Sequence, residues 1–353
     1  MKLIHCADLH LDSPMESNLP PDKAKERRNE ILSTFSDLVE LADENGAAAL
    51  LIAGDLFDSV RTTRRTERYV LDLIRSHPDL YFFYLAGNHD TGSALSSPED
   101  KPRNLCTFGE NWTTYDFGEV CITGSERPDP ELLELPTNKI NIVLLHGQKK
   151  ESGVSDGDTI PFRKYRDRGI DYLALGHLHS YQEAALDDRG IACYSGCLEG
   201  RGFDECGMKG YVLLEIENGK LSHEFIPMSR RSLHEVECDV SNCASQMDVE
   251  DLVFRMTDPI PKKDLVKVVL VGSVSPDTSV DLSRLGQLLS ERYYFAKVVM
   301  KTRVRIRPEE FSGDVSLKGE FVRRVMESSL TDAEKERVIT CGFRALCGEE
   351  LDV

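Results

Sequence analysis

The sequence predicts an α/β fold, and three observations lead to this prediction. Short apolar runs alternate with amphipathic helical stripes over the first part of the chain. Polar clusters follow these runs, and the carboxyl ends of strands in an α/β sheet are where ligand sites form. The length of 353 residues, with 40% hydrophobic and 29% charged residues, suits two globular domains rather than a disordered chain.

The N-terminal elements are predicted in the order βαβαβ. An apolar run at 3–6 predicts the first strand, and a helix is expected from about 22 to 45, ending at Gly46. One face of that helix carries its apolar side chains, which are Ile31, Phe35, Leu38, Val39 and Ala42. A buried strand at 47–53, a helix at 64–76 and a buried strand at 80–86 follow.

The middle of the chain is predicted to be rich in strands. Apolar runs at 140–145 and 172–175 each end at a turn that contains histidine. Further strands are expected at 193–195, 210–216 and 221–226, and Asn218-Gly219 is typical of a tight hairpin turn. A change of rhythm near 227–232 indicates a boundary, so we expect domains at 1–229 and 230–353.

The second domain is predicted to mix strands and helices. Strands are expected at 266–271, 296–300 and 303–307, with a helix at 283–292. Two helices at 318–326 and 332–347 carry an apolar set that consists of Phe321, Val325, Val338, Ile339, Phe343 and Leu346. This set either completes the domain or docks a partner protein.

Charge divides the chain unevenly. The net charge is −18, which argues against a protein that coats nucleic acid non-specifically but not against an enzyme with a local basic track. Residues 1–229 carry 24 basic and 39 acidic residues, a net charge of −15. The stretch 284–307 carries seven basic residues and one acidic residue, so any phosphate backbone contact is expected there rather than over the whole surface.

Targeting signals and cysteine motifs are absent from the sequence. The first residues lack an apolar segment of the kind found in signal peptides, and no run of 18 apolar residues predicts a membrane span. The ten cysteines contain no CxxC pair. We therefore expect a cytoplasmic protein with no membrane association, whose cysteines are free and mostly buried.

Five polar clusters follow predicted strands and contain five of the nine histidines. They are Asp8-Leu9-His10, Gly54-Asp55-Leu56-Phe57-Asp58, Gly87-Asn88-His89-Asp90, His146-Gly147 and Gly176-His177-Leu178-His179. Each cluster alone could be an ordinary turn or a buried histidine, but their joint occurrence at strand ends favours a ligand site. Histidine nitrogen, carboxylate and amide oxygen suit Mn, Fe or Zn in a catalytic site, since structural zinc prefers sulfur.

The spacing of these residues allows two ions. A carboxylate such as Asp55 has two oxygens and can bridge two ions, and His177 and His179 can each serve a different one. Two ions about 3.5–4 Å apart bind both the attacking water and a phosphoryl oxygen in an in-line displacement. The pattern therefore predicts metal-dependent phosphoester hydrolysis.

The pattern D-x-H, G-D-x-x-D, G-N-H-D, H, G-H-x-H resembles the calcineurin-like metallophosphoesterase superfamily over about residues 1–180. The resemblance implies a four-layer α/β/β/α sandwich followed by a small C-terminal α+β capping domain. Within the superfamily, His5 to Pro14, Leu317 to Arg323 and Gly342 to Leu346 resemble the SbcD/YhaO-type DNA repair exonucleases.

The resemblance also implies roles for individual residues. The first metal would be bound by Asp8, His10, Asp55 and His179, and the second by Asp55, Asn88, His146 and His177. His89 would protonate the leaving oxygen, with Asp90 orienting its ring. Asp58 departs from the histidine of archaeal and eukaryotic relatives, which puts a second catalytic histidine at that position in doubt. Family members favour manganese.

DNA contacts are predicted at two groups of basic residues. Arg61, Arg64, Arg65 and Arg68 follow the Asp58 loop at helical spacing, and Lys301, Arg303, Arg305 and Arg307 alternate along a predicted strand. Either group could instead be a solvated face. Tyr293-Tyr294-Phe295 could stack on bases, although core packing is the better explanation of this run.

The resemblance implies a protein that works with a coiled-coil ATPase of the SbcC/YhaN type, docked on Phe321, Val325, Val338 and Phe343, and that forms a homodimer. The expected function is hydrolysis of DNA phosphodiester bonds by metal-activated water, as part of a DNA repair exonuclease. The alternatives are a phosphodiesterase or phosphatase for small nucleotides, and a DNA-binding or ATPase-docking subunit with little activity of its own.

Overall fold

Two units make up the chain, Met1–Leu233 and His234–Val353. The computed structural model describes residues 1–15, 19–58, 62–88, 90, 95, 101–151, 158–274, 280–304 and 313–346. The sequence predicts the division after residue 229, and contacts place it after Leu233. The two units are therefore described one after the other.

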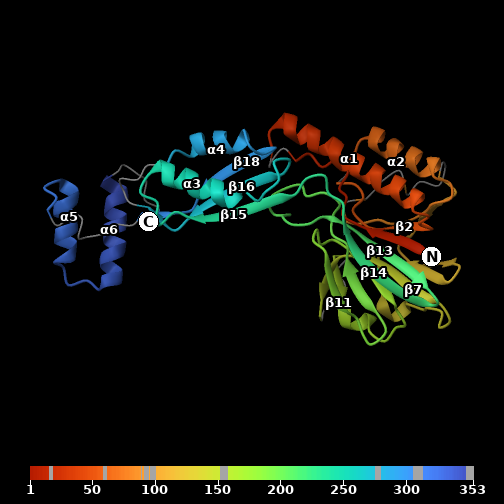
Figure 1. Ribbon diagram of the computed structural model, residues 1–353. Coiled ribbons are helices and arrows are strands. Elements are labelled where there is room, and N and C mark those ends of the chain that lie inside the picture. Colours follow the sequence, from red (N-terminus) through yellow and green to blue (C-terminus); the bar gives the residue numbers. More distant parts are fainter. Residues whose placement is uncertain are drawn as a thin grey trace. The chain divides into compact units, whose positions relative to one another are not determined.

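The first sheet of the first unit has the strand order β14-β13-β1-β2-β3-β4. Strands β1 to β4 are parallel, and β13 and β14 extend the sheet as an antiparallel hairpin (Figure 1). Their bounds are β1 (Lys2–Cys6), β2 (Ala49–Ala53), β3 (Tyr81–Leu85), β4 (Leu105–Thr107), β13 (Gly210–Glu217) and β14 (Lys220–Pro227). The carboxyl ends of β1, β2 and β3 therefore lie at one edge of the sheet.

The second sheet has the order β11-β12-β10-β7-β6-β5, with a parallel centre and an antiparallel strand at each edge. The bounds are β5 (Thr113–Phe117), β6 (Val120–Gly124), β7 (Ile140–His146), β10 (Tyr172–Gly176), β11 (Gln182–Ala185) and β12 (Ile191–Tyr194). A small pair, β8 (Gln148–Lys150) and β9 (Thr159–Pro161), lies outside both sheets.

The two sheets pack face to face over one apolar core, which joins Leu51 and Phe83 of the first sheet to Ile142 and Ala174 of the second. Helices α1 (Pro21–Glu44) and α2 (Arg64–Ser76) cover the outer face of the first sheet (Figure 1). That face buries side chains absent from the inter-sheet core, such as Ile52. Because β2 is buried along its whole length, its continuous apolar run has a physical cause.

The outer face of the second sheet is covered by short 3-10 turns rather than by long helices. Phe162 and Tyr165 of η4 (Phe162–Tyr165) and Leu133, just after η3 (Pro130–Leu132), pack on Val143 and Leu173. The predicted α/β class and its layered order are therefore confirmed, and in the described residues the fourth layer is built from turns.

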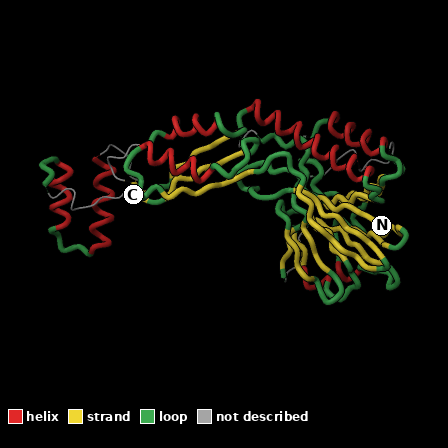
Figure 2. Tube along the Cα trace, viewed as in Figure 1, coloured by secondary structure: helices red, strands yellow, loops and turns green. Residues whose placement is uncertain are grey.

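The second unit contains a three-stranded sheet of β15 (Leu233–Asp239), β16 (Leu265–Val271) and β18 (Phe295–Met300). Helices α3 (Gln246–Thr257) and α4 (Leu282–Ser290) cover one face of it, as Figure 2 shows. A short pair, β17 (Ser273–Val274) and β19 (Arg303–Val304), and an antiparallel helix pair, α5 (Leu317–Met326) and α6 (Asp332–Leu346), complete the unit.

Several elements were not predicted from the sequence. The largest are helix α3 and the β5–β6 hairpin. Helix α3 begins at a capping box, in which the side chains of Ser245 and Asp248 each accept a hydrogen bond from the backbone N–H of the other residue. A capping box is a sequence signal for a helix start, but the mixed composition of this helix obscured it. The hairpin lies at a sheet edge, where β5 is only half-buried and its apolar alternation is weak.

The predictions on membrane spans and disulfides can be compared with the structure over the described residues. None of their helices is long and apolar enough to cross a membrane. The nine described cysteines are free, and five of them are buried. Cys347 lies outside the described residues.

Candidate metal centre

The predicted ligands converge because five parallel strands end at the same edge of the sandwich. Asp8, Asp55 and Asn88 follow β1, β2 and β3 of the first sheet. His146 ends β7, and His177 follows β10 of the second sheet, where Gly176 pairs with His146. Residues up to 169 positions apart in sequence are thereby brought within hydrogen-bonding range.

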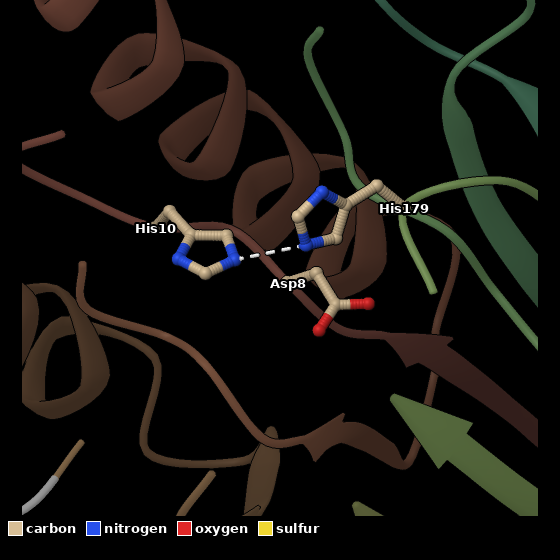
Figure 3. Close-up of side chains that lie close together, drawn as sticks. All are labelled: Asp8, His10 and His179. Atoms are coloured by element: carbon tan, nitrogen blue, oxygen red, sulfur yellow. Dashed lines mark hydrogen bonds between the residues drawn. The ribbon is translucent and has the colours of Figure 1, made fainter. Parts of the chain in front are cut away.

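The first ligand group consists of Asp8, His10 and His179, whose donor atoms lie within 4.8 Å of one another. Figure 3 shows His10 and His179 presenting their Nε2 atoms to each other beside the Asp8 carboxylate. The two Nε2 atoms are 3.2 Å apart. This is about the separation of two nitrogens that bind one ion at roughly 2.0–2.1 Å each, so the donor set fits a metal ion.

The second ligand group consists of Asp8, Asp55 and His146. The Nδ1 atom of His146 lies 3.0 Å from the carbonyl oxygen of Ala53, which can only accept a hydrogen bond. A proton on Nδ1 satisfies this contact, and Nε2, which lies 3.1 Å from Asn88 Oδ1 and 3.3 Å from Asp55 Oδ2, is then the nitrogen that could bind a metal. This is the tautomer that a metal ligand needs.

Asp55 lies between the two groups. Its Oδ2 atom is 3.3 Å from His146 Nε2 and 3.7 Å from His10 Nε2. Asp8 is a member of both groups. Two buried carboxylates between the His10–His179 pair and His146 form a donor set that fits a pair of cations, because cations compensate the cost of burying these charges.

Burial dominates the electrostatics of the site. Burial raises the pKa of Asp8, and neighbouring histidines only partly offset it. Burial also lowers the pKa of His10, which favours the neutral ring that binds metals. For His146, burial lowers the pKa, but the contacts with Asp55, Asp8 and the Ala53 carbonyl together outweigh burial and raise the pKa to about 9.

The backbone at the site is strained in a way that the sequence does not reveal. Asp8, His10 and Asp55 have φ values of 54°, 46° and 52°, in the left-handed region that non-glycine residues avoid. Such outliers persist where surrounding contacts fix them, and they cluster at functional sites. Here they turn the chain sharply after β1 and β2, so that the ligand side chains point at one another.

Two motif glycines leave room for the ligands. A Cβ atom on Gly87 would lie 2.1 Å from Asp55 Oδ1, and one on Gly54 would lie 2.2 Å from His146 Nδ1. Gly54 also has a φ of 91°. Any side chain at these positions would displace a ligand, which explains why glycine precedes Asp55 and Asn88.

Asp90 connects two of the ligand loops. Its carboxylate accepts hydrogen bonds from the backbone N–H groups of Leu56, Phe57 and Gly87, at 3.1, 2.8 and 2.9 Å. Burial raises its pKa to about 6, although these three donors oppose the shift. The described contacts of Asp90 are therefore with the backbone, and the predicted contact with His89 lies outside the described residues.

The remaining predicted site residues are His177, which lies beside the ligand groups, the arginines of α2, and residues that the structure does not describe. The half-buried His177 ring lies outside both ligand groups, edge-on to His146 with ring centroids 5.5 Å apart, and its backbone N–H bonds to Asp8. Arg64, Arg65 and Arg68 are exposed on α2, whose N-cap Thr63 donates its backbone N–H to Asp12 at 2.9 Å. His89, Arg61, Arg305 and Arg307 lie outside the described residues.

Of the basic strip predicted in the second unit, Lys301 and Arg303 lie among the described residues, and Arg303 begins β19. The backbone N–H groups of Lys301 and Arg303 bond to the carbonyls of Leu270 and Gly272, both at 2.8 Å. Both basic residues are exposed. Tyr293 is buried, and its hydroxyl bonds to the Thr257 carbonyl, which favours core packing over base stacking for this residue.

Two residues of the site were not predicted from the sequence. Glu205 Oε1 lies 2.7 Å from His179 Nδ1, and Arg201 contacts both Glu205 and Asp58. They lie in the long connection after β12, beyond the last histidine cluster. In the sequence, they belong to the charged residues Glu199, Arg201, Asp204 and Glu205, which follow the uncharged stretch 190–198.

A sandwich of two mixed sheets, with Asp, His and Asn side chains at the ends of its parallel strands, defines a metal-dependent phosphoesterase. Residues 1–181 match the family described as calcineurin-like phosphoesterase, and the chain belongs to this family. The chain is therefore a hydrolase of phosphate esters, with Asp and His residues positioned to bind metal ions.

Curated relatives agree with the predicted branch. The chain is 27% identical over 296 residues to the uncharacterized metallophosphoesterase YhaO of Bacillus subtilis, covering 77% of this chain and 72% of the relative. It is 25% identical to the DNA double-strand break repair protein Mre11 of Aeropyrum pernix, covering 69% and 65%. It is 22% identical to the SbcD component of the nuclease SbcCD of Escherichia coli K12, covering 99% of each chain. The resemblance to the SbcD/YhaO type is confirmed.

Proposed function

We propose that this chain is a nuclease subunit that hydrolyses DNA phosphodiester bonds with two divalent metal ions, as a DNA repair exonuclease. The observation that carries the proposal is the pair of ligand groups that share Asp8, with Asp55 between them. One ion is held by Asp8, His10, Asp55 and His179, and the other by Asp55, Asn88, His146 and His177. Manganese is the proposed metal, since it accepts both imidazole and carboxylate ligands.

When bound, two such ions activate a water molecule and neutralise charge on the phosphate. The protein's contribution is orientation. The Ala53 carbonyl fixes the His146 tautomer, and the backbone donors to Asp90 hold the loops after β2 and β3 together. We assign to His89, next to Asn88 in sequence, the transfer of a proton to the leaving oxygen.

DNA is proposed as the substrate because two relatives are named for double-strand break repair and for a nuclease. Exposed arginines on α2 support phosphate contacts in the first unit, and Lys301 and Arg303 support them in the second unit, which we propose as the capping domain. Arginine and lysine contacts to phosphates supply the salt-dependent part of binding. The acidic balance of the first unit limits that binding to these positions.

A coiled-coil ATPase of the SbcC/YhaN type is the proposed partner, since the Escherichia coli relative is named as one component of a nuclease. The helix pair α5–α6 is the proposed docking element. Val325 and Phe343 are buried in the core of the pair, and Phe321 packs against it. Exposed apolar side chains remain on the outside, namely Leu317, Met326, Leu330 and Val338.

The test compares manganese-dependent hydrolysis of a chromogenic phosphodiester with that of end-labelled duplex DNA. We expect both to be hydrolysed. The proposal fails if the small ester is turned over and DNA with blunt, recessed or overhanging ends never is, which would favour a small nucleotide substrate. The variant His89→Asn is expected to abolish hydrolysis while manganese remains bound, and simultaneous loss of metal would refute its role as a proton donor.

DNA binding is tested separately by charge reversal in the second unit. The double variant Lys301→Glu/Arg303→Glu is expected to weaken binding and to reduce the slope of log affinity against log salt by about 1 per lost phosphate contact. Arg255→Glu is the matched control, since Arg255 is an exposed basic residue of α3 in the same unit and lies outside the stretch 284–307. Equal slopes for the wild type and the double variant would exclude this strip as a phosphate track.

A further inference from the structure

The segment 197–209, which lies beyond the residues that match the family, surrounds His179. We propose that Asp58, Arg201 and Glu205 form a carboxylate–guanidinium–carboxylate clamp that positions His10 and His179 and thereby sets the affinity of one metal ion only. Arg201 and Glu205 are thus positioning residues. The inference rests on the proposed function, in that Asp8, His10 and His179 hold that ion.

A carboxylate stands behind each of the two imidazoles. Asp58 Oδ1 lies 3.2 Å from His10 Nδ1, and Glu205 Oε1 lies 2.7 Å from His179 Nδ1. A carboxylate can only accept, so the 2.7 Å contact with Glu205, which is shorter than the 3.2 Å contact of Arg201 Nη2 with the same atom, places the ring proton of His179 on Nδ1 and leaves the lone pair on Nε2. For His10, Asp58 stands at an ion-pair distance from Nδ1, on the side of the ring away from His179. The two Nε2 atoms then face each other at 3.2 Å, an arrangement that a cation between them stabilises.

Arg201 joins the two carboxylates. Its Nη1 atom donates to Asp58 Oδ1 at 2.9 Å, and its Nη2 atom donates to Glu205 Oε1 at 2.8 Å. The backbone N–H of Arg201 also donates to Glu205 Oε2 at 2.8 Å. One planar fork therefore couples His10, after β1, to His179, after β10, and a lysine ammonium cannot reproduce this geometry.

The segment itself is fixed to the body of the unit. Lys209, which is 1% exposed, donates a hydrogen bond from Nζ to the carbonyl of His179 at 2.6 Å. Lys209 therefore holds the backbone of His179, and Glu205 holds its ring. Just before the clamp, Glu199 accepts from buried Arg27 and from Thr34 of α1, both at 2.8 Å. The clamp therefore has little freedom to move when an ion binds.

The second ligand group has a different support. His146 is held by the Ala53 carbonyl of β2, and its other polar contacts are with Asp8, Asp55 and Asn88, all outside segment 197–209. Loss of the clamp should therefore weaken the binding of one ion and leave the binding of the other unchanged. A general loosening of the fold would instead weaken both.

The test measures Mn²⁺ binding to the full chain by electron paramagnetic resonance and calorimetry, without reference to activity. Two reference variants, His179→Gln and His146→Gln, identify which binding step belongs to which group. In Glu205→Gln and Arg201→Met, we expect the step lost in His179→Gln to weaken about 10–100-fold, as is typical for partners of metal ligands. The Mn²⁺ affinity of the step lost in His146→Gln should stay within about twofold of the wild type, because His146 and His179 are held by different residues.

Two further variants sharpen the result. Arg201→Lys keeps the charge without the fork and is expected to behave like Arg201→Met, so wild-type affinity in Arg201→Lys would overturn the bridging role. Arg189→Met is the matched control, because it removes an arginine that binds Asp171 through Nε and Nη2 elsewhere in the same unit. Circular dichroism of the metal-free variants checks that each is folded.

The outcomes separate this inference from the proposed function. Equal weakening of both steps, or no weakening in either Glu205→Gln or Arg201→Met, overturns the clamp. If the wild type takes up no Mn²⁺, or if His179→Gln removes neither step, the assignment of the metal centre itself is wrong.

Discussion

The two units of the chain treat charge in opposite ways. The first unit buries charged side chains on several elements, and these include Asp8, Arg27, Asp55, Asp90, Glu199, Glu205 and Lys209. In the described part of the second unit, the buried charged residues are Glu250 and Asp264, and the basic strip is exposed. Burying a charge is costly unless it is paired, so the first unit retains such charges at the site and its supports.

The net charge of −15 over 1–229 does not come mainly from the site. The carboxylates at the ligand groups are only Asp8 and Asp55, and those in the clamp are partnered by Arg201. Most of the acidic excess therefore lies elsewhere on the unit. We infer that an acidic body repels DNA in general and restricts productive approach to the cationic metal pair and to local basic residues.

The largest expected effect comes from the carboxylate between the ligand groups. Asp55→Asn should reduce hydrolysis by more than about a thousandfold, because metal-ion stabilisation is worth several kcal/mol and each 1.4 kcal/mol is tenfold. Steady-state rates on a chromogenic phosphodiester measure this loss. Asp116→Asn, at an exposed ion pair with Lys139 in the same unit, should leave the rate unchanged. A loss of less than tenfold in Asp55→Asn would contradict a role between two ions.

A buried ion pair in the first unit gives the next largest effect. Arg27 is 1% exposed and pairs with Glu199 at 2.8 Å, so Arg27→Met should lower the free energy of unfolding by about 3–5 kcal/mol, since it leaves a buried charge unpaired. Denaturant titration measures the change. The double variant Arg27→Met/Glu199→Gln should recover part of the loss, and a double variant as unstable as the sum of the two single variants would show that the pair is not coupled.

The histidine buried between the sheets gives a pH-dependent effect. Burial lowers the pKa of His5 to about 3, and its Nδ1 lies 2.9 Å from the Tyr172 hydroxyl. The ring is neutral in the folded protein and takes up a proton in the unfolded chain below about pH 6.5. Its contribution is complete above that pH and falls by about 1.4 kcal/mol per unit as the pH drops towards 3.

Denaturant unfolding at pH 4.5 to 7 in the presence of a chelator measures this slope. His5→Gln should remove the contribution of this residue, whereas Tyr172→Phe, which deletes only the hydroxyl partner, should keep it. Identical slopes in the wild type and His5→Gln would show that the ring does not remain neutral in the folded state.

The smallest effect is expected from an exposed ion pair of the second unit. Asp258 pairs with Arg292 at 2.9 Å, and its side chain is 72% exposed. Asp258→Asn should change the free energy of unfolding by at most about 1 kcal/mol, because solvent screens such pairs. A loss as large as that of Arg27→Met would contradict the distinction between the two units.

Most of the first unit could be predicted from the sequence because its central strands are buried on both faces. The apolar runs of β1, β2, β3, β7 and β10 are strong signals, and the residues after them carry the ligand chemistry. The edge strands β4, β5 and β11 and the 3-10 turns were not predicted, because they are short and carry few apolar residues, whereas the edge strand β14 was predicted. Helix α3 was missed because its apolar pattern is weak, although its capping box is a sequence signal for a helix start.

The sequence alone predicted which residues bear the ligand chemistry and in what order, because each candidate ligand lies at the end of a strand with a clear apolar run or within a few residues of it. Only the tertiary structure decided how those ligands are held. The Ala53 carbonyl lies 93 residues from His146, and Arg201 lies 143 residues from Asp58 and 22 residues from His179. No local pattern encodes such contacts, since they depend on two sheets packing face to face and on a loop anchored to α1 by Arg27.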